Sequence, residues 1–533
     1  MALSNSSTHH LPESSTLVSY FDLSTFSFFL ATTVFVVLLS RARQSRDAIP
    51  ILNPKNRFEL TAHRVKKLFL TNGNTMVDSW FNANPHKPAR LHADFGEVTI
   101  LPPNLTNEIR NDERFNFSKW TLNAFHGHTP GFEGFREGGH DSRILQNVII
   151  KDITKSLNLI TGPLAEETAL AVSDVLPSDK EWHTITVRST IAHIVARVSS
   201  RVFLGTEICR NKRWLQITLR YTVDAFMAAE NLRLWPAPFR PLVHWFMPSC
   251  QKLRSEVAEA KEIITPVLED RRLKKKQAQQ GQVKYEAPDD AIEWVERAAN
   301  GESYDPVSIQ LILSVAAIHT TSDLVTQVMV RLAQNPEILE PLRNEIQATL
   351  KQDGWRKSSL YNMKLLDSVI KESQRLKPIG NVVMRRVVSE DVTLSDGTRI
   401  SKDSTIVVTS RRLWDKNIYS EPDKWDGYRF YNMRSDPDKQ ASAQLVATSD
   451  KFLAWGHGKH ACPGRFFASN EVKIILIHVL MNYDWELPEG ASTVIHNVGL
   501  AMTMDPALEL RIKEREVPLR FERVPCQYLA SKF

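Results

Sequence analysis

The residues of this chain that are best suited to chemistry lie in one short loop near its C-terminal end. Residues 452–466 read FLAWGHGKHACPGRF, and Cys462 stands just ahead of an expected helix. The dipole and the free N–H groups at a helix start stabilise a thiolate, the form of cysteine that attacks electrophiles or binds metals. Gly456, Gly458 and Gly464 fall within nine residues, which predicts positive φ or close approach to a flat ligand. The alternative for Cys462 is an inert buried thiol.

The remaining cysteines do not form a framework of their own. The 533 residues include four cysteines, and Cys209, Cys250 and Cys526 show neither CxxC spacing nor a zinc-like pairing with histidines. This usage suits a reducing compartment, where a thiolate persists. The net charge of +6 predicts a mixed solvated surface, with attraction to acidic partners or anionic lipid as the alternative. No segment resembles a nucleic-acid-binding module, so nucleic acid is not an expected partner.

A long helix is predicted between two clear boundary signals. Asp305 and Pro306 form a cap and first turn, and Asn335-Pro336 ends the helix. Its centre, residues 311–318, is apolar nearly all round and is expected to be buried on every face. His319, Thr320 and Thr321 form a polar cluster that is costly there unless it is used. The alternative is that the hydroxyls bond back to helix carbonyls.

The rest of the chain reads as mainly helical with a smaller β part. Turns and strands are expected up to about residue 139, helices over 149–269, and a polar surface loop over 270–290. A further helix over 360–376 stops before Pro378, strands follow at 387–394 and 405–409, and the last helix starts near residue 463. No internal repeat is visible, so one large folded unit is expected.

The N-terminal region predicts a membrane anchor. Residues 23–40 carry no charge and are followed by Arg41, Arg43 and Arg46, whereas no Lys or Arg precedes them. The positive-inside rule then places a lumenal tail at 1–22, a single span at 23–40 and a basic, proline-containing linker at 41–55 on the cytosolic side. A cleaved signal peptide is the alternative. Asn5 opens a glycosylation sequon in the expected lumenal tail.

The cysteine loop resembles the haem-binding signature of the cytochromes P450. Gly458, His460, Cys462 and Gly464 match Phe-x-x-Gly-x-Arg/His-x-Cys-x-Gly, and Trp455 replaces the usual Phe. The resemblance implies a cytochrome P450 fold over residues 56–533 and haem b bound through Cys462, because cysteinate pushes electron density onto haem iron and favours O–O cleavage. The hypothesis for Trp455 is that its indole N–H donates to the sulfur and raises the reduction potential.

Three further stretches resemble family motifs. Glu372 and Arg375 stand at i, i+3, a spacing that by itself often gives only a surface ion pair. Their continuation through Pro378 resembles Glu-x-x-Arg-Leu-x-Pro, which implies a buried structural network of Glu372, Arg375 and Arg429. Residues 316–321 resemble the oxygen-activation site, which implies that Thr320 holds oxygen and helps to deliver protons. His319 replaces the expected acid and can relay protons near neutral pH. The candidate partners of the haem propionates are His460, Arg385 and Lys151.

The motifs cover most of the chain and resemble a fungal subset of the family that acts on terpenoid-like secondary metabolites. This implies an NADPH- and O2-dependent monooxygenase in the endoplasmic reticulum membrane, with its catalytic domain in the cytosol. An NADPH-dependent reductase would dock on the cysteine side, where Lys459 and Arg465 are expected to be exposed. The substrate would be an apolar small molecule. The alternatives are a haem-thiolate isomerase, dehydratase or peroxygenase that needs no reductase, and a haem-binding sensor or carrier. The expected pocket walls are residues 129–139, 232–247, 316–320, 379–384 and 499–502.

Overall fold

The computed structural model describes residues 32, 49–59, 61–139 and 144–516. The chain divides into residues 1–50 and a compact unit, Ile51–Phe533. The expected tail at 1–22, the sequon at Asn5 and nearly all of the expected anchor at 23–40 lie outside the described residues, as does Cys526.

The compact unit is mainly helical, as predicted, with 57% helix and 12% strand. The longer helices are α2 (His63–Ala83), α4 (Phe117–Ala124), α7 (Leu157–Val175), α8 (Val187–Phe203), α10 (Lys212–Arg233), α12 (Pro248–Gln279), α13 (Ala291–Ala299), α14 (Pro306–Gln334), α15 (Leu339–Asp353), α17 (Lys364–Leu376) and α20 (Arg465–Asn482). The shorter ones are α3 (Thr106–Ile109), α5 (Glu133–Gly139), α6 (Ile144–Asn147), the π-helix η2 (Val148–Ile153), α9 (Gly205–Ile208), α11 (Arg240–Val243), α16 (Lys357–Asn362), α18 (Arg429–Met433) and α19 (Gln440–Ala443).

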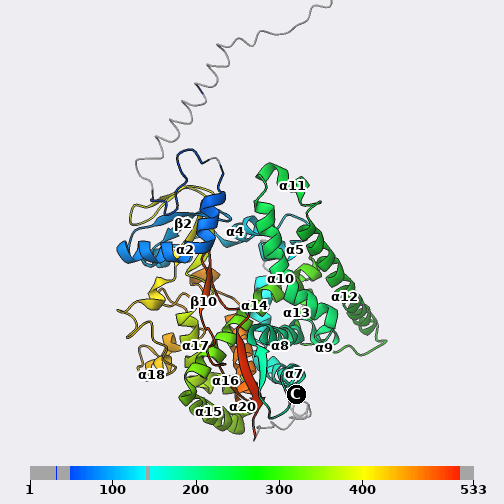
Figure 1. Cartoon of the computed structure of the whole chain (residues 1–533). Coiled ribbons are helices and arrows are strands. Elements are labelled where there is room, and N and C mark those ends of the chain that lie inside the picture. Colours follow the sequence, from blue (N-terminus) through cyan, green and yellow to red (C-terminus); the bar gives the residue numbers. More distant parts are fainter. Residues whose placement is uncertain (1–31, 33–48, 60, 140–143, 517–533) are drawn as a thin grey trace, which may run out of the picture. The chain divides into compact units, whose positions relative to one another are not determined.

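The strands gather mostly on one side of the unit, beside α2 (Figure 1). A five-stranded sheet has the order β1 (Ala89–Ala93), β2 (Gly96–Leu101), β8 (Thr405–Thr409), β5 (Val382–Val388), β3 (Phe115–Asn116). A three-stranded sheet has the order β4 (His183–Thr186), β12 (Glu509–Glu514), β9 (Tyr483–Glu486). The pairs β10 (Ile495–Val498) with β11 (Ala501–Met504) and β6 (Val392–Thr393) with β7 (Arg399–Ile400) complete the β part.

Several local predictions match the structure closely. The Asp305 carboxylate accepts hydrogen bonds from the N–H groups of Val307 and Ser308, and α14 ends at Asn335. Some expectations are wrong. Residues 117–124 and 133–139 form the helices α4 and α5 where turns and strands were expected. Residues 63–83 form a helix rather than turns and strands, because Phe69, Val77 and Phe81 lie on one face of α2 and pack on β1 and β2. Residues 270–279 continue α12 rather than forming a loop; their polar side chains are solvated or ion-paired.

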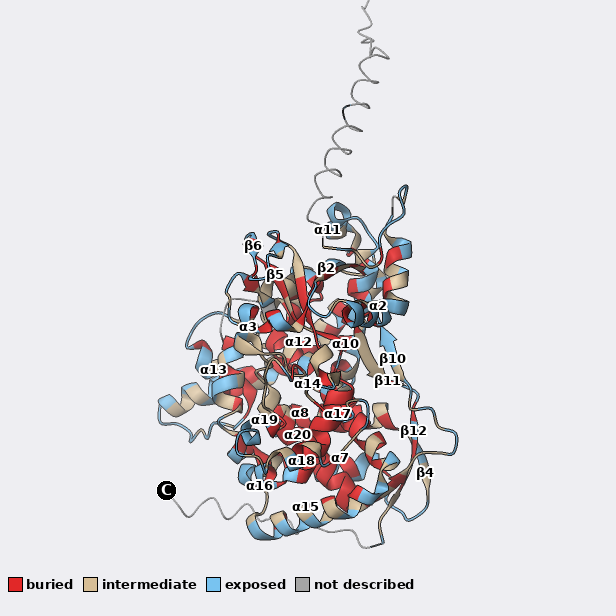
Figure 2. Ribbon diagram, turned by 90° about the vertical axis from the view of Figure 1, so that its left-hand side faces the viewer, coloured by how far each residue is buried: buried red, intermediate tan, exposed pale blue. Residues whose placement is uncertain are grey.

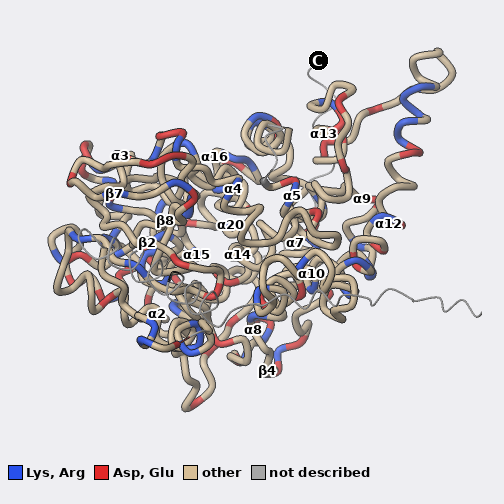
Figure 3. Tube along the Cα trace, turned by 90° about the horizontal axis from the view of Figure 1, so that it is seen from above, with Lys and Arg blue, Asp and Glu red and all other residues tan. Residues whose placement is uncertain are grey.

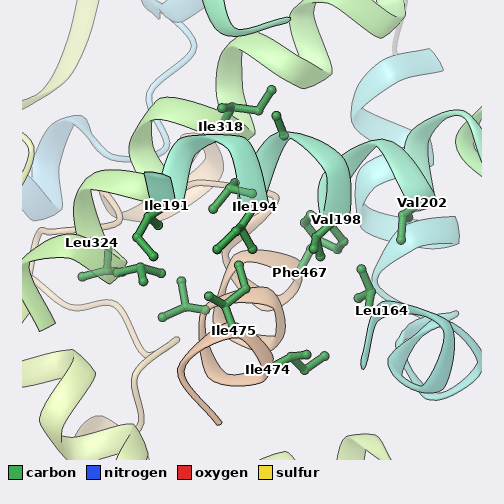
Figure 4. Close-up of a cluster of buried hydrophobic side chains, with 14 of the residues drawn as sticks. Leu164, Ile191, Ile194, Val198, Val202, Ile318, Leu324, Phe467, Ile474 and Ile475 are labelled. Atoms are coloured by element: carbon green, nitrogen blue, oxygen red, sulfur yellow. The ribbon is translucent and has the colours of Figure 1, made fainter. Parts of the chain in front are cut away.

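The core of the helical part lies where α7, α8, α14 and α20 meet (Figure 2). Figure 4 shows Ile191, Ile194 and Val198 of α8 facing Ile474, Ile475 and Phe467 of α20, with Ile318 and Leu324 of α14 beside them. All these side chains are buried. Since α20 starts just after the cysteine loop, this packing joins that loop firmly to the interior.

The helix α14 is also long and apolar enough to cross a membrane, but 67% of its most apolar window is buried inside the protein. Its contacts with α5, α8, α10 and α20 identify it as a core helix. In Figure 3 the positions of Lys and Arg and those of Asp and Glu are interspersed along the backbone trace of the described chain, as expected from the modest net charge.

Candidate active site

The loop that carries Cys462 is held by backbone hydrogen bonds. The Cys462 N–H donates to the Trp455 carbonyl at 2.8 Å, and the Ala461 N–H donates to the Gly458 carbonyl at 3.0 Å. Gly458 has a φ of +78°, and a Cβ built on it would lie 2.5 Å from the Arg110 carbonyl oxygen. Glycine is therefore required here both for the left-handed backbone and for the close approach of the neighbouring turn.

The sulfur of Cys462 lies at the start of α20. Burial raises the pKa of the Cys462 thiol, and the backbone N–H groups of Gly464 and Arg465, together with the Arg465 guanidinium, act in the opposite direction. A cation bound to the sulfur would favour the thiolate, because it offsets the cost that burial imposes on the charged form. A Cβ built on Gly464 meets no atom within 4 Å other than those of its chain neighbours, so the space next to Gly464 is open.

Trp455 does not donate to the sulfur. Its indole Nε1 donates to the Leu445 carbonyl at 2.8 Å. An indole has a single N–H, so the hypothesis of a hydrogen bond from Trp455 to Cys462 is wrong. The ring itself packs against the main hydrophobic core, and its backbone carbonyl accepts from the Cys462 N–H.

A cluster of cationic and aromatic side chains lies close to the cysteine loop. The rings of Phe117 and Trp120 on α4 stack with their centroids 5.9 Å apart. The guanidinium of Arg385 lies 5.6 Å from the Trp120 ring centroid, and that of Arg386 lies 5.5 Å from the Phe117 centroid. The His460 ring centroid is 6.0 Å from that of Phe117. We call these five residues the cationic cluster.

A β-bulge brings the two arginines into this cluster. Consecutive residues of a regular strand point to opposite faces. The register of β5 against β8 shifts between Val383 and Arg386, and Met384 has a φ of +54°. This break in alternation lets Arg385 and Arg386 both reach the stacked rings of α4. A bulged residue at positive φ is a strained arrangement of the kind found at functional sites.

The cationic cluster is suited to bind an anion. Within the part of the chain that the structure describes, no carboxylate pairs with Arg385 or Arg386. Burial lowers the pKa of both, that of Arg386 to about 10. Burial and the charges of Arg386 and Lys459 lower the pKa of His460 to about 4. The buried Nε1 of Trp120 also has no partner among the described residues. Buried cations and N–H donors with no nearby acid favour an anionic ligand.

One face of α14 is open. Ala316 and Thr320, one turn apart, are exposed although their neighbours on the other faces are buried or half-buried. The expectation that residues 311–318 are buried on every face is therefore wrong. Ile379 is likewise 51% exposed within a run of otherwise buried residues. The Thr320 hydroxyl donates to the Ala316 carbonyl at 2.8 Å. This is the alternative arrangement, in which a hydroxyl of the polar cluster bonds back to a carbonyl of its own helix.

A family model described as Cytochrome P450 matches residues 98–509, which include the cysteine loop, the cationic cluster and the open face of α14. The chain belongs to the cytochrome P450 family.

Curated relatives match nearly the whole chain. "Cytochrome P450 monooxygenase hepE" of Aspergillus oryzae is 46% identical over 93% of this chain and 91% of its own length. "Cytochrome P450 monooxygenase TRI1" of Fusarium sporotrichioides is 43% identical over 95% and 94%. "Dihydromonacolin L monooxygenase mokC" of Monascus pilosus is 36% identical over 96% and 95%. The chain is thus a cytochrome P450 monooxygenase of the fungal secondary-metabolite type, acting on small molecules.

The cytochrome P450 family implies haem, and the residues present fit it. Cys462 offers a sulfur with two N–H donors beside it and open space next to Gly464. The cationic cluster offers positive charge for two propionates through Arg385 and Arg386, and His460 offers a neutral imidazole that can donate a hydrogen bond. Lys151 lies apart from this arrangement: its side chain is exposed on η2 and makes no ion pair with another described residue.

The structure brings Glu372, Arg375 and Arg429 together. Arg375 donates to both carboxylate oxygens of Glu372, at 2.8 and 2.9 Å, and Arg429 donates to one of them at 3.0 Å. Glu372 and Arg375 are completely buried. Arg375 also donates to the Leu413 carbonyl at 2.6 Å. The i, i+3 pair of this P450 is therefore internal, and it connects α17 with the chain that leads to the cysteine loop.

His319 faces another helix. Its Nε2 lies 3.1 Å from the Leu219 carbonyl of α10, and burial lowers its pKa. With that nitrogen engaged by α10, we expect His319→Ala to release as much peroxide per NADPH consumed as the wild type. Thr320→Ala, the matched control one residue along, should release more. Peroxide yield rising in His319→Ala as well would restore the relay role.

Sequence reasoning missed Arg386, Trp120 and Phe117. The adjacent arginines in a strand were a usable signal, since one of two neighbours should have faced the interior. Trp120 and Phe117 lie in a segment for which no helix was expected, and their sequence spacing carries no signal for a ligand. Of the two residues expected to be exposed for reductase docking, Lys459 is exposed, whereas Arg465 is half-buried and donates to the Val446 and Cys462 carbonyls.

Proposed function

We propose that this P450 is an NADPH- and O2-dependent monooxygenase that hydroxylates an apolar, terpenoid-like small molecule. The balanced reaction is R–H + O2 + NADPH + H+ giving R–OH, NADP+ and water. Haem bound through a cysteinate supplies reductive activation of O2 and cleavage of the O–O bond. The observation that supports this most is Cys462 at a helix start together with a half-buried cationic cluster whose arginines pair with no carboxylate of the described chain.

Thr320 is the residue we assign to proton handling. Because its hydroxyl hydrogen goes to the Ala316 carbonyl, the oxygen lone pairs remain as acceptors on the open face of α14. A hydroxyl held in this way accepts a hydrogen bond from a water molecule and passes a proton on by rotating. Ala316, one turn away on the same open face, is apolar, which suits an apolar substrate.

The test is expression of the full chain in a host with an NADPH–cytochrome P450 reductase, fed candidate terpenoids under isotopically labelled O2. The expected product carries one labelled oxygen atom and forms only with NADPH and reductase. Product without NADPH, or with peroxide in its place, would favour the isomerase, dehydratase or peroxygenase alternatives. Carbon monoxide binding with no product from any substrate class would favour the sensor or carrier.

We also propose that the catalytic domain is cytosolic and rests on the endoplasmic reticulum membrane. The contact with the membrane is supported, within the described chain, by an apolar surface patch in the segment between α10 and α12. In this patch Leu234 is 70% exposed and Phe246 is 74% exposed. The other members of the patch are Trp235, Phe239, Leu242 and Trp245. A contiguous exposed apolar patch marks an interaction site, and tryptophan suits the lipid–water interface.

The patch predicts contact of specific tryptophans with lipid. In nanodiscs that contain brominated lipid, part of the tryptophan fluorescence of the full chain should be quenched. The double variant Trp235→Phe/Trp245→Phe is expected to lose most of that quenchable part, because both indoles lie in the patch. Trp182→Phe is the control, because Trp182 directly precedes β4 and is not part of the patch. This variant should keep the quenchable part of the fluorescence. An unchanged quenchable part in the double variant would rule out this contact.

A further inference from the structure

Side chains of α17 hold the segment 442–446, which ends six residues before the first residue of the cysteine loop, Phe452. Lys371 donates to the carbonyls of Ser442 and Gln444, at 2.7 and 2.6 Å. The Asp367 carboxylate accepts from the Leu445 N–H at 2.8 Å. Asp367 and Lys371 stand one turn apart on α17 and therefore share a face. Three backbone polar groups of this stretch, the carbonyls of Ser442 and Gln444 and the N–H of Leu445, are thus bound by one helix.

The same segment holds the residues that flank Cys462. The Leu445 carbonyl accepts the indole N–H of Trp455 at 2.8 Å, and the Val446 carbonyl accepts from Arg465 Nε at 3.1 Å. Trp455 and Arg465 in turn bond the Cys462 backbone: the Trp455 carbonyl accepts the Cys462 N–H at 2.8 Å, and Arg465 Nη1 donates to the Cys462 carbonyl at 2.8 Å. A continuous set of hydrogen bonds therefore joins α17 to the cysteine.

The charges that hold this segment are deeply buried. Lys371 is completely buried, with its Nζ 4.8 and 4.2 Å from the ring centroids of Phe430 and Phe452. Asp367 pairs with Lys473 at 2.5 Å and also with Arg434. Burying such charges is costly unless each of them is fully paired and hydrogen-bonded. Two apolar side chains in place of Asp367 and Lys371 would pack this site at a lower cost in free energy. The two charges are therefore better explained by the precise position in which they hold the segment 442–446.

We infer that Asp367 and Lys371 are positioning residues for the Cys462 sulfur, acting through the Leu445 peptide group and the Trp455 indole. This inference rests on the proposed function, since it requires Cys462 to bind the haem iron. It also explains why tryptophan replaces phenylalanine at 455: a phenyl ring has no N–H, and the Leu445 carbonyl would lose that donor. The position of Trp455 then decides how well the N–H groups of Gly464 and Arg465 reach the sulfur.

The test is a double-mutant cycle on the holoenzyme, with Lys371→Met and Trp455→Phe. Weaker hydrogen bonding to the sulfur disfavours the ferrous state. Each variant is expected to lower the ferrous-to-ferric ratio at a fixed potential by about tenfold, or about 59 mV for one electron. Because both substitutions act on the same series of hydrogen bonds, the double variant should shift the reduction potential little more than either single variant does. A direct bond from Trp455 to the sulfur would instead give additive shifts.

Lys377→Met is the matched control. Lys377 is as deeply buried, follows the end of α17 and pairs with Asp323, away from the segment 442–446. It should keep the wild-type potential and the wild-type ferrous–CO spectrum. Three results would overturn the inference: additive shifts of the reduction potential in the double variant, no shift in the single variants, or an equal shift in Lys377→Met. If Lys371→Met does not assemble, Trp455→Phe alone decides, and an unchanged potential overturns it. Failure of the proposed function is distinct, since Cys462→Ser would then keep its ferrous–CO band.

Discussion

Cys462→Ser protein is expected to lose the ferrous–CO Soret band of the wild type and all NADPH-dependent product formation. A serine hydroxyl stays protonated at neutral pH and is a poor donor to iron, so the electron push that favours O–O cleavage disappears. The loop itself should persist, because its bonds from Cys462 N–H to the Trp455 carbonyl and from Arg465 to the Cys462 carbonyl involve only backbone atoms of residue 462. The measurement is the carbon monoxide difference spectrum of purified protein, together with its haem content.

Cys209→Ser and Cys250→Ser are the controls. Both cysteines are free and buried, and burial raises the pKa of both, that of Cys209 to about 11. They should keep the wild-type spectrum and activity. Alkylation adds an independent check, because a sulfur bound to iron is protected until the haem is removed. A wild-type Soret band in Cys462→Ser, or a freely alkylated Cys462 in the haem-replete wild type, would contradict the assignment.

Glu372→Leu is expected to prevent accumulation of folded haem protein. Its carboxylate accepts from both Arg375 and Arg429, and Arg375 has no exposed surface. Removing the acid leaves a buried guanidinium without its counter-charge, which costs about 3–5 kcal/mol. That is a large part of the total stability of a folded domain. The measurements are the yield of soluble haem protein and the urea midpoint of whatever folds.

Glu340→Leu is the matched control for spacing. Glu340 and Arg343 are also at i, i+3, but their side chains are 4.0 Å apart and that of Glu340 is 68% exposed. Loss of such a surface pair changes stability by about 0–1 kcal/mol. Similar urea midpoints for the two variants would mean that the buried network contributes no more than an ordinary surface pair.

Much of the fold and part of the site were predictable because their signals come from residues close together in the chain. The bounds of α14 follow from Asp305, Pro306 and Asn335, whose signals act within one helical turn. The mainly helical class follows from periodicity over short windows. By contrast, α2 was missed because its apolar stripe is interrupted by polar residues, and because part of its contact is with β10, far along the chain.

The sequence by itself determined which sulfur to suspect, because glycines, cysteine and the start of a helix are adjacent in the chain and act on one another locally. It also determined the family, since the order of short motifs survives without knowledge of their contacts. The tertiary structure alone decided which partner each polar group takes. The indole of Trp455 binds Leu445, the ring of His319 binds Leu219, and Arg386 comes to rest on Phe117. A hydrogen bond is satisfied by whichever acceptor the fold brings within about 3 Å. The first two of these partners are 10 and 100 positions apart, too far for the chain between them to signal the contact locally.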